Sequence, residues 1–236
     1  MPSRNETKQY VTNGFYHIYN RGVEKRNIFL DQQDYGVFLS YLKEYLLPKN
    51  ERELANKLAD PNVSSREKAK IIKLLRMNNF ADEIILFAYC LMPNHFHLLI
   101  KQRNSDTIDR FINSIGTRYT MYFNRKYERV GPLYQGVYKA VLVTSDEQLL
   151  HLTRYIHKNP FKLKHTASQG HPLQDFRLEA QPSSYPEYVG QRKTTWIDTD
   201  NVLTYFSKTN SKLSYKAFVE TNEDLQKIQG LIIEEN

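Results

Sequence analysis

The sequence predicts an α+β fold in which helices pack on an antiparallel sheet. The β-rich run at 83–90 is followed by a Pro-Asn turn and a second β-rich run at 95–100, a pattern typical of two neighbouring antiparallel strands. Segments 105–127 and 145–160 instead carry apolar residues at every third or fourth position, which is the period of an amphipathic helix. The chain therefore combines strands and helices, each indicated by a local pattern.

Three further segments precede the central strands. Residues 14–22 form a run of β-forming residues bounded by glycines, whose side chains would alternate between the two faces of a strand, and this predicts a strand. Residues 33–47 carry apolar residues at helical spacing and stop at a proline, which predicts a helix. From 49 to 79 the composition turns charged, with eight Lys and Arg against four Asp and Glu, and Ser64 with Glu67 forms a capping box. We expect the segment 49–79 to be a helical insertion.

The last long helix carries side chains that could take part in catalysis or metal binding. A short strand at 137–143 leads into it, and Ser145 with Gln148 forms a second capping box at its start. The apolar stripe that faces the core consists of Leu149, Leu152 and Ile156. A neighbouring polar face holds three residues at intervals of four: His151, Tyr155 and Asn159. The tyrosine and the asparagine are thereby stacked one turn apart.

Composition limits the class of protein. The chain has 236 residues, of which 40% are hydrophobic, and this is enough for a packed core. Cys90 is the single cysteine, so internal disulfides and cysteine zinc sites are excluded. Since the N-terminus is polar and no long apolar run occurs, we expect a soluble, cytoplasmic protein without a membrane span. The net charge of +7, with 17 tyrosines and 12 phenylalanines, suits nucleic-acid binding, although a solvated basic surface would have the same composition.

The strand at 95–100 contains two histidines one residue apart. Because side chains alternate between faces along a strand, His95 and His97 point to one side, opposite to Phe96, Leu98 and Ile100. Two imidazoles on one strand face are a natural start for a divalent metal site. The alternative is a pair of polar positions on a half-exposed strand, and the pattern by itself leaves both open.

Tyr155 is a candidate nucleophile. A phenol reacts poorly at neutral pH unless its target is polarised or its proton is removed. If the last helix packs with Tyr155 facing the histidines, a bound ion can hold a scissile phosphate while the phenolate attacks phosphorus, and Asn159 can add an oxygen ligand. The alternative is that Tyr155, like most of the 17 tyrosines, is a packing residue.

Four ordered motifs together resemble one family. The blocks "YHIYNRG", "YCLMPNHFHLLI", "GPLYQGVYKAVLV" and "LTRYIHKNP" are similar to the signature blocks of the REP-associated tyrosine transposases, relatives of the single-tyrosine insertion-sequence transposases among the HUH endonucleases. The resemblance covers Tyr16 to Pro160, and "SSYPEYVG" and "WIDTDNVLTYF" resemble the C-terminal part of the family. It implies a ferredoxin-like fold with helices on one face of the sheet. It divides the chain into a catalytic domain at 1–165, interrupted by the insertion at 49–79, and an extension of loop and helix at 166–236.

The resemblance also implies roles for particular residues. Matched to the family motifs, His95 and His97 become ligands of a divalent metal, Mg²⁺ or Mn²⁺, and Tyr155 becomes the nucleophile. The asparagine of the Asn-Pro pair, Asn159, becomes a third ligand. Family blocks and charge further indicate four residues for DNA contact, namely Arg21, Arg118, Gln135 and Lys139.

The implied activity is the cutting of single-stranded DNA near an imperfect hairpin, with the 5′ phosphate joined to tyrosine and a 3′ hydroxyl released. Relatives act as monomers or as homodimers, and the sequence does not decide between them. The insertion either extends the DNA surface or is a solvated helical hairpin, and we expect the second.

Two other functions stay open. A domesticated regulator would bind DNA hairpins without cutting, although it would not need the intact nucleophile. A metal hydrolase that uses water needs a general base, for which the sequence offers no H-E-x-x-H motif and only the histidines His17, His151 and His157.

Overall fold

A four-stranded antiparallel sheet organises the part of the chain that the computed structural model describes, which is residues 10–167, 182–221 and 225–232. Its strands lie in the order β2-β3-β1-β4 and are β1 (Phe15–Arg21), β2 (Ile84–Met92), β3 (His95–Gln102) and β4 (Lys139–Val143). Helix α1 (Gln32–Leu46) leads from β1 to β2, and helix α4 (Thr107–Lys126) leads from β3 to β4. Two interleaved β-α-β units of this kind make the ferredoxin-like fold, so the predicted fold class is confirmed.

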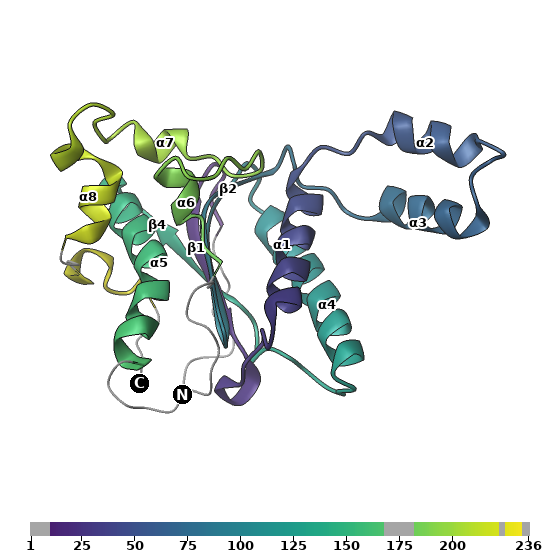
Figure 1. Ribbon diagram of the computed structural model, residues 1–236, viewed down its shortest axis with the longest axis horizontal. Coiled ribbons are helices and arrows are strands. Elements are labelled where there is room, and N and C mark those ends of the chain that lie inside the picture. Colours follow the sequence, from purple (N-terminus) through teal and green to yellow (C-terminus); the bar gives the residue numbers. More distant parts are fainter. Residues whose placement is uncertain (1–9, 168–181, 222–224, 233–236) are drawn as a thin grey trace.

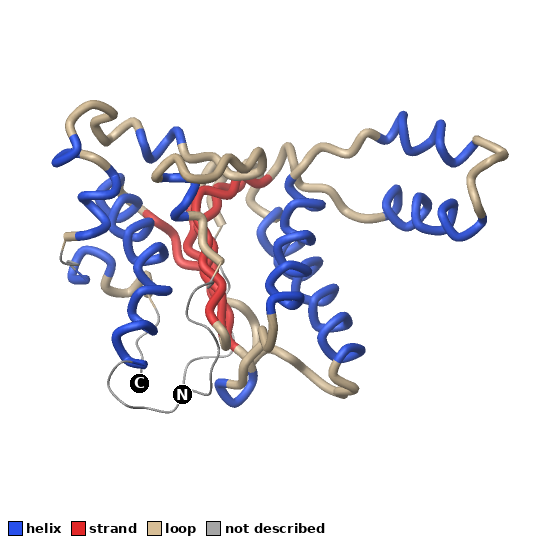
Figure 2. Tube along the Cα trace, in the orientation of Figure 1, coloured by secondary structure: helices blue, strands red, loops and turns tan. Residues whose placement is uncertain are grey.

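Helices cover both faces of the sheet (Figure 1), whereas the family resemblance placed them on one. Helices α1 and α4 pack on the first face. Helix α5 (Asp146–Ala167) packs against β2 and β3 on the second face, and Figure 2 shows the strands between these two groups of helices. The chain returns to the second face after β4 because the stripe of Leu149, Leu152 and Ile156 needs an apolar partner.

Alternation along β3 divides the core in two. The side chains of Phe96, Leu98 and Ile100 are buried with aromatic and aliphatic residues of α1 and α4, among them Phe38, Leu42, Phe111 and Ile115. Leu99 belongs to the other cluster, together with residues of α5 and of the C-terminal segment. The predicted assignment of the β3 side chains to two opposite faces is therefore confirmed.

Helix ends follow the local sequence. Asp31 caps α1 by accepting a hydrogen bond from the Asp34 amide at 3.0 Å, and α1 ends just before Pro48. The predicted capping serine of α5 is also present, since Ser145 Oγ accepts from the Gln148 amide at 3.2 Å. Helix α5 is longer than the predicted segment 145–160, because it continues through Pro160 to Ala167.

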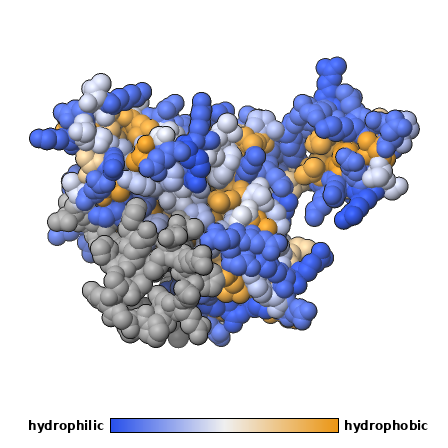
Figure 3. Space-filling view, viewed as in Figure 1, coloured by the Kyte–Doolittle hydropathy of each residue, from blue (hydrophilic) through white to orange (hydrophobic). Residues whose placement is uncertain are grey.

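The charged insertion forms a helical hairpin of α2 (Glu51–Ala59) and α3 (Ser65–Arg76), which projects from the body (Figure 1). Ser64 caps α3 as predicted. Helix α2 contains no buried residue, and α3 contains only Ile71. Hydrophobic atoms lie between the two helices and hydrophilic atoms at the rim (Figure 3). The hairpin therefore stabilises itself mainly by contacts within the pair.

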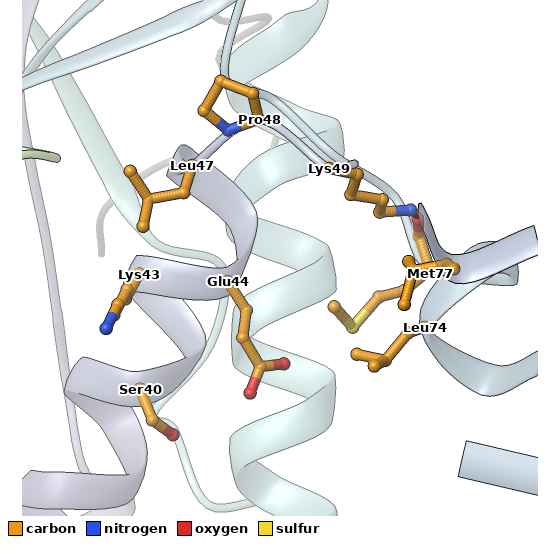
Figure 4. A pocket seen from close by; sticks show the side chains of 9 residues that line it. Ser40, Lys43, Glu44, Leu47, Pro48, Lys49, Leu74 and Met77 are labelled. Carbon is orange, nitrogen blue, oxygen red and sulfur yellow. Dashed lines mark hydrogen bonds between the residues drawn. The ribbon is translucent and has the colours of Figure 1, made fainter. Parts of the chain in front are cut away.

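A pocket of about 400 Å³ lies where the hairpin joins α1. Figure 4 shows Glu44 of α1 on one side and Leu74 and Met77 on the other. Lys49 Nζ donates to the carbonyl of Met77, which ties the two ends of the hairpin together. The lining residues come from α1 and from the hairpin, and they serve to attach the insertion.

The C-terminal segment packs beside α5 through short helices. They are α6 (Tyr185–Tyr188), α7 (Asp200–Leu203), α8 (Tyr215–Glu220) and the 3₁₀ turns Ser211–Leu213 and Leu225–Ile228, and a further 3₁₀ turn, Val23–Lys25, follows β1. Tyr188, Val202 and Tyr215 share one core with α5 and the sheet. The predicted division of the chain at 165 stays a prediction, and part of 166–236 lies outside the described residues. None of the described helices is long and apolar enough to cross a membrane.

Candidate active site

The two histidines of β3 lie on the face of the sheet that α5 covers. The register of β1 against β3 places Arg21 directly opposite His95 and Tyr19 directly opposite His97. The ring of His95 stands perpendicular to that of His97, with centroids 4.9 Å apart. His97 is fully buried and His95 is half-buried, so neither histidine is an ordinary surface residue.

A third histidine joins this pair. His17 of β1 is fully buried, and its ring lies nearly parallel to that of His97, with centroids 5.1 Å apart. His17 Nε2 lies 2.9 Å from His97 Nδ1, and His17 Nδ1 is hydrogen-bonded to the carbonyl of Leu231. The sequence offered His17 only as a general base, and it gave no sign of this pairing.

Burial keeps the imidazoles of His17 and His95 neutral at neutral pH. Burial lowers the pKa of His17 to about 4, although the hydrogen bond to the Leu231 carbonyl acts in the opposite direction. Burial, assisted by the charge of Arg21, also lowers the pKa of His95 to about 4. A neutral imidazole keeps a lone pair on one nitrogen, and this is the form that binds metal ions.

Tyr155 meets the histidines from α5. Its side chain is 5% exposed, and its ring stands edge-on to His97 with centroids 5.5 Å apart and an interplanar angle of 86°. The ring of His17 is 6.4 Å away. The apolar stripe of α5 packs on the sheet and so turns the neighbouring tyrosine towards β1 and β3. The structure thus brings the candidate nucleophile to the histidine motif.

Asn159 lies one helical turn after Tyr155. It is 3% exposed, and within the described part of the chain its Nδ2 is buried without a hydrogen-bond partner. Asn159 therefore offers a hydrogen-bond donor that still needs an acceptor, because an amide nitrogen does not bind cations. Its carbonyl oxygen is a suitable donor for a hard divalent cation.

The types of donor atom present suit a divalent metal. In the described ranges, no group of three or more His, Cys, Asp or Glu residues is arranged to hold a metal. Two neutral imidazoles and one amide oxygen, as supplied by His95, His97 and Asn159, would leave other positions for water and phosphate oxygens. Mg²⁺ keeps several such ligands in protein sites, and imidazole also suits first-row metals such as Mn²⁺.

Of the four residues expected to contact DNA, three lie together at the edge of this site. Arg21 Nε donates to Gln135 Oε1 at 3.1 Å, and Lys139 of β4 pairs with Tyr19 in the neighbouring strand. Gln135 and Lys139 are exposed. Because Arg21 is opposite His95, the two side chains lie on the same face of the sheet, and the charge of Arg21 acts on His95.

Arg118 is not brought to these residues. It belongs to α4, which packs on the first face of the sheet, and its guanidinium forms an ion pair with Glu44 at 2.7 Å. The guanidinium carbon also lies 3.7 Å from the ring centroid of Tyr41. These contacts give Arg118 a structural role between α1 and α4.

The other two candidate bases have different partners. His157 is fully buried, lies 2.6 Å from the Tyr215 hydroxyl and 2.7 Å from Ser184 Oγ, and burial lowers its pKa to about 3. His151 Nδ1 accepts from Arg154 at 2.7 Å. The described contacts of both residues are thus with α5 itself or with the C-terminal segment.

Sequence reasoning missed one residue next to the motif. Asn94 Oδ1 lies 2.6 Å from His95 Nδ1, and Asn94 Nδ2 donates to the carbonyl of Lys25 at 3.3 Å. The Pro-Asn pair before the strand was interpreted only as a turn signal. Its position directly before a candidate ligand could have indicated the second role.

A comparison with known protein families agrees with the motifs. The family model described as IS200-like transposase matches residues 37–159. A solved structure of a REP-associated tyrosine transposase bound to a REP hairpin aligns with a TM-score of 0.46 and 12% identity, over 83% of this chain and 98% of that chain. A candidate transposase from Deinococcus radiodurans aligns with a TM-score of 0.33 and 16% identity, over 65% of this chain and 96% of that chain. No curated protein sequence matches the chain.

Proposed function

Because the chain belongs to the IS200-like transposase family, we propose that it cuts and rejoins single-stranded DNA beside hairpins, with Tyr155 as the nucleophile. The family match covers the histidine motif and the tyrosine together. The observation that supports the proposal best is the edge-on contact between Tyr155 and His97, on the face of the sheet that also holds His95.

His95, His97 and Asn159 would hold the divalent cation. When bound, Mg²⁺ or Mn²⁺ supplies Lewis-acid polarisation of the scissile phosphate. Arg21 beside His95 adds a fixed positive charge, and together with Gln135 and Lys139 it would hold the flanking phosphates. These residues thereby orient the DNA for attack.

The chemical step is a transesterification at phosphorus. The phenolic oxygen of Tyr155 forms a bond to phosphorus, and the bond from phosphorus to the 3′ oxygen of the preceding nucleotide breaks. The proton lost by the phenol is balanced by the proton gained by the departing 3′ oxygen. The products are a 5′-phosphotyrosine and a free 3′ hydroxyl, and attack by a 3′ hydroxyl in the reverse direction rejoins a strand.

The test uses the full-length protein, Mn²⁺ and labelled single-stranded hairpins that copy the DNA flanking the gene. Denaturing gels should reveal a labelled protein band and a released fragment. Binding without cleavage would instead identify a hairpin-binding regulator, and cleavage without a protein adduct would identify a water-dependent hydrolase. Either of these results would overturn the proposal.

A further inference from the structure

We propose that His17 is a positioning residue that fixes the tautomer of His97, so that His97 presents the lone pair of its Nε2 to the catalytic cation. The identity of that cation rests on the proposed function. The tautomer itself follows from contacts within this chain.

The chain of hydrogen bonds begins at a backbone carbonyl. The Leu231 carbonyl can only accept, so the hydrogen bond that it shares with His17 Nδ1 requires a proton on that nitrogen. A neutral imidazole carries one N–H, which leaves the lone pair of His17 on Nε2. His17 Nε2 therefore acts as an acceptor.

His97 must supply the proton for the next bond. Its Nδ1 lies 2.9 Å from His17 Nε2, so His97 Nδ1 donates and the lone pair of His97 is on Nε2. The two rings are nearly parallel at 19°, and both side chains are fully buried, which holds the pair in one arrangement. Histidine ligands commonly donate their second N–H in this way.

An independent contact imposes the same tautomer on His95. Asn94 Nδ2 donates to the Lys25 carbonyl, and this fixes which end of the amide is the oxygen. Asn94 Oδ1 then accepts from His95 Nδ1 at 2.6 Å. Both histidines of the motif thus keep Nε2 free of a proton, each through a partner on its Nδ1.

The first measurement needs no metal. Long-range ¹H–¹⁵N correlation spectra of the full-length protein report which nitrogen of each histidine ring is protonated. We expect a protonated Nδ1 and a non-protonated Nε2 for His17, His95 and His97. A proton on His97 Nε2 in the wild-type protein would overturn the proposal.

The second measurement is the affinity for Mn²⁺ alone, obtained by electron paramagnetic resonance without DNA. His17→Leu removes the acceptor and should weaken binding by about 10- to 100-fold, whereas His17→Gln keeps an amide oxygen and should recover most of the affinity. His157→Leu is the matched control, because it removes another buried histidine that bonds to Tyr215 and Ser184, and its affinity should equal that of the wild type.

Unchanged affinity in His17→Leu would contradict the proposal. If His17→Leu does not fold, the wild-type spectrum and the His17→Gln affinity decide it. If the wild type binds no Mn²⁺, the proposed metal site fails, and the ring spectra still decide the tautomer of His97.

Discussion

The ring of Tyr155 stands edge-on to the ring of His97, with centroids 5.5 Å apart. These two residues are 58 positions apart in the sequence and come from different elements, α5 and β3. Their contact joins the histidine motif and the tyrosine motif into one site. The account of function depends on this contact, and the predictions below test its parts.

Removal of one histidine ligand should slow cleavage strongly and leave DNA binding intact. We expect His95→Ala to lower the cleavage rate at least about 100-fold, because loss of the bound cation removes several kcal/mol of transition-state stabilisation. DNA affinity should stay close to that of the wild type, since phosphate contacts by other residues remain. Single-turnover cleavage with and without chelator measures the effect. Full activity of His95→Ala in excess chelator would contradict the metal site.

Arg21 and Arg118 should behave differently when replaced by alanine. Arg21→Ala should weaken the binding of every DNA sequence to a similar extent. It should also reduce the slope of log affinity against log salt by about 1, the loss expected for one phosphate contact. Arg118→Ala should leave affinity unchanged and lower the free energy of unfolding by about 1 kcal/mol, because it loses Glu44 and the Tyr41 ring. Titrations at several salt concentrations and denaturant unfolding separate the two effects. Equal losses of DNA affinity in both variants would show that the assignment of Arg118 to structure is wrong.

The helical hairpin should be dispensable for folding. Replacement of 50–76 by a short Gly-Ser linker removes α2 and α3, which together bury only Ile71. We expect the melting temperature to change by less than about 4 °C, since about 1 kcal/mol corresponds to a shift of that size in a chain of this length. Calorimetry measures the change. Loss of cooperative unfolding would mean that the hairpin belongs to the core.

The same deletion tests the two interpretations of the insertion. A solvated hairpin predicts unchanged DNA affinity, and this is the outcome that we expect. An affinity loss of about tenfold at low salt, which becomes smaller at higher salt because the variant has fewer phosphate contacts to lose, would instead mean that the hairpin extends the DNA surface.

Local patterns predicted much of the fold and of the site. Alternation along β3 assigned His97 and Leu98 to opposite faces, and the apolar stripe of α5 left Tyr155 on the neighbouring side. Both predictions depend only on residues close in sequence, where side-chain direction follows from the period of the element.

Relationships between distant segments could not be predicted in this way. The pairing of His17 with His97 depends on the register of β1 against β3, which no local pattern specifies. The charge of Arg118 suggested DNA contact and did not reveal its ion pair with Glu44. That pair forms because α4 packs beside α1, and the packing of two helices distant in sequence is not specified by a local pattern. The contact of Leu231 with His17 joins residues 214 positions apart and was equally hidden.

The most direct test of the central claim is whether Tyr155→Phe still forms a covalent adduct with DNA. The substitution removes one hydroxyl and keeps the ring that packs against His97, so folding and DNA binding should stay close to those of the wild type. With DNA labelled on the 3′ side of the cut, we expect the wild type to give a labelled protein band and Tyr155→Phe to give neither the band nor a cleaved fragment. A labelled band that persists in Tyr155→Phe would contradict the account, because another residue would then carry the phosphate.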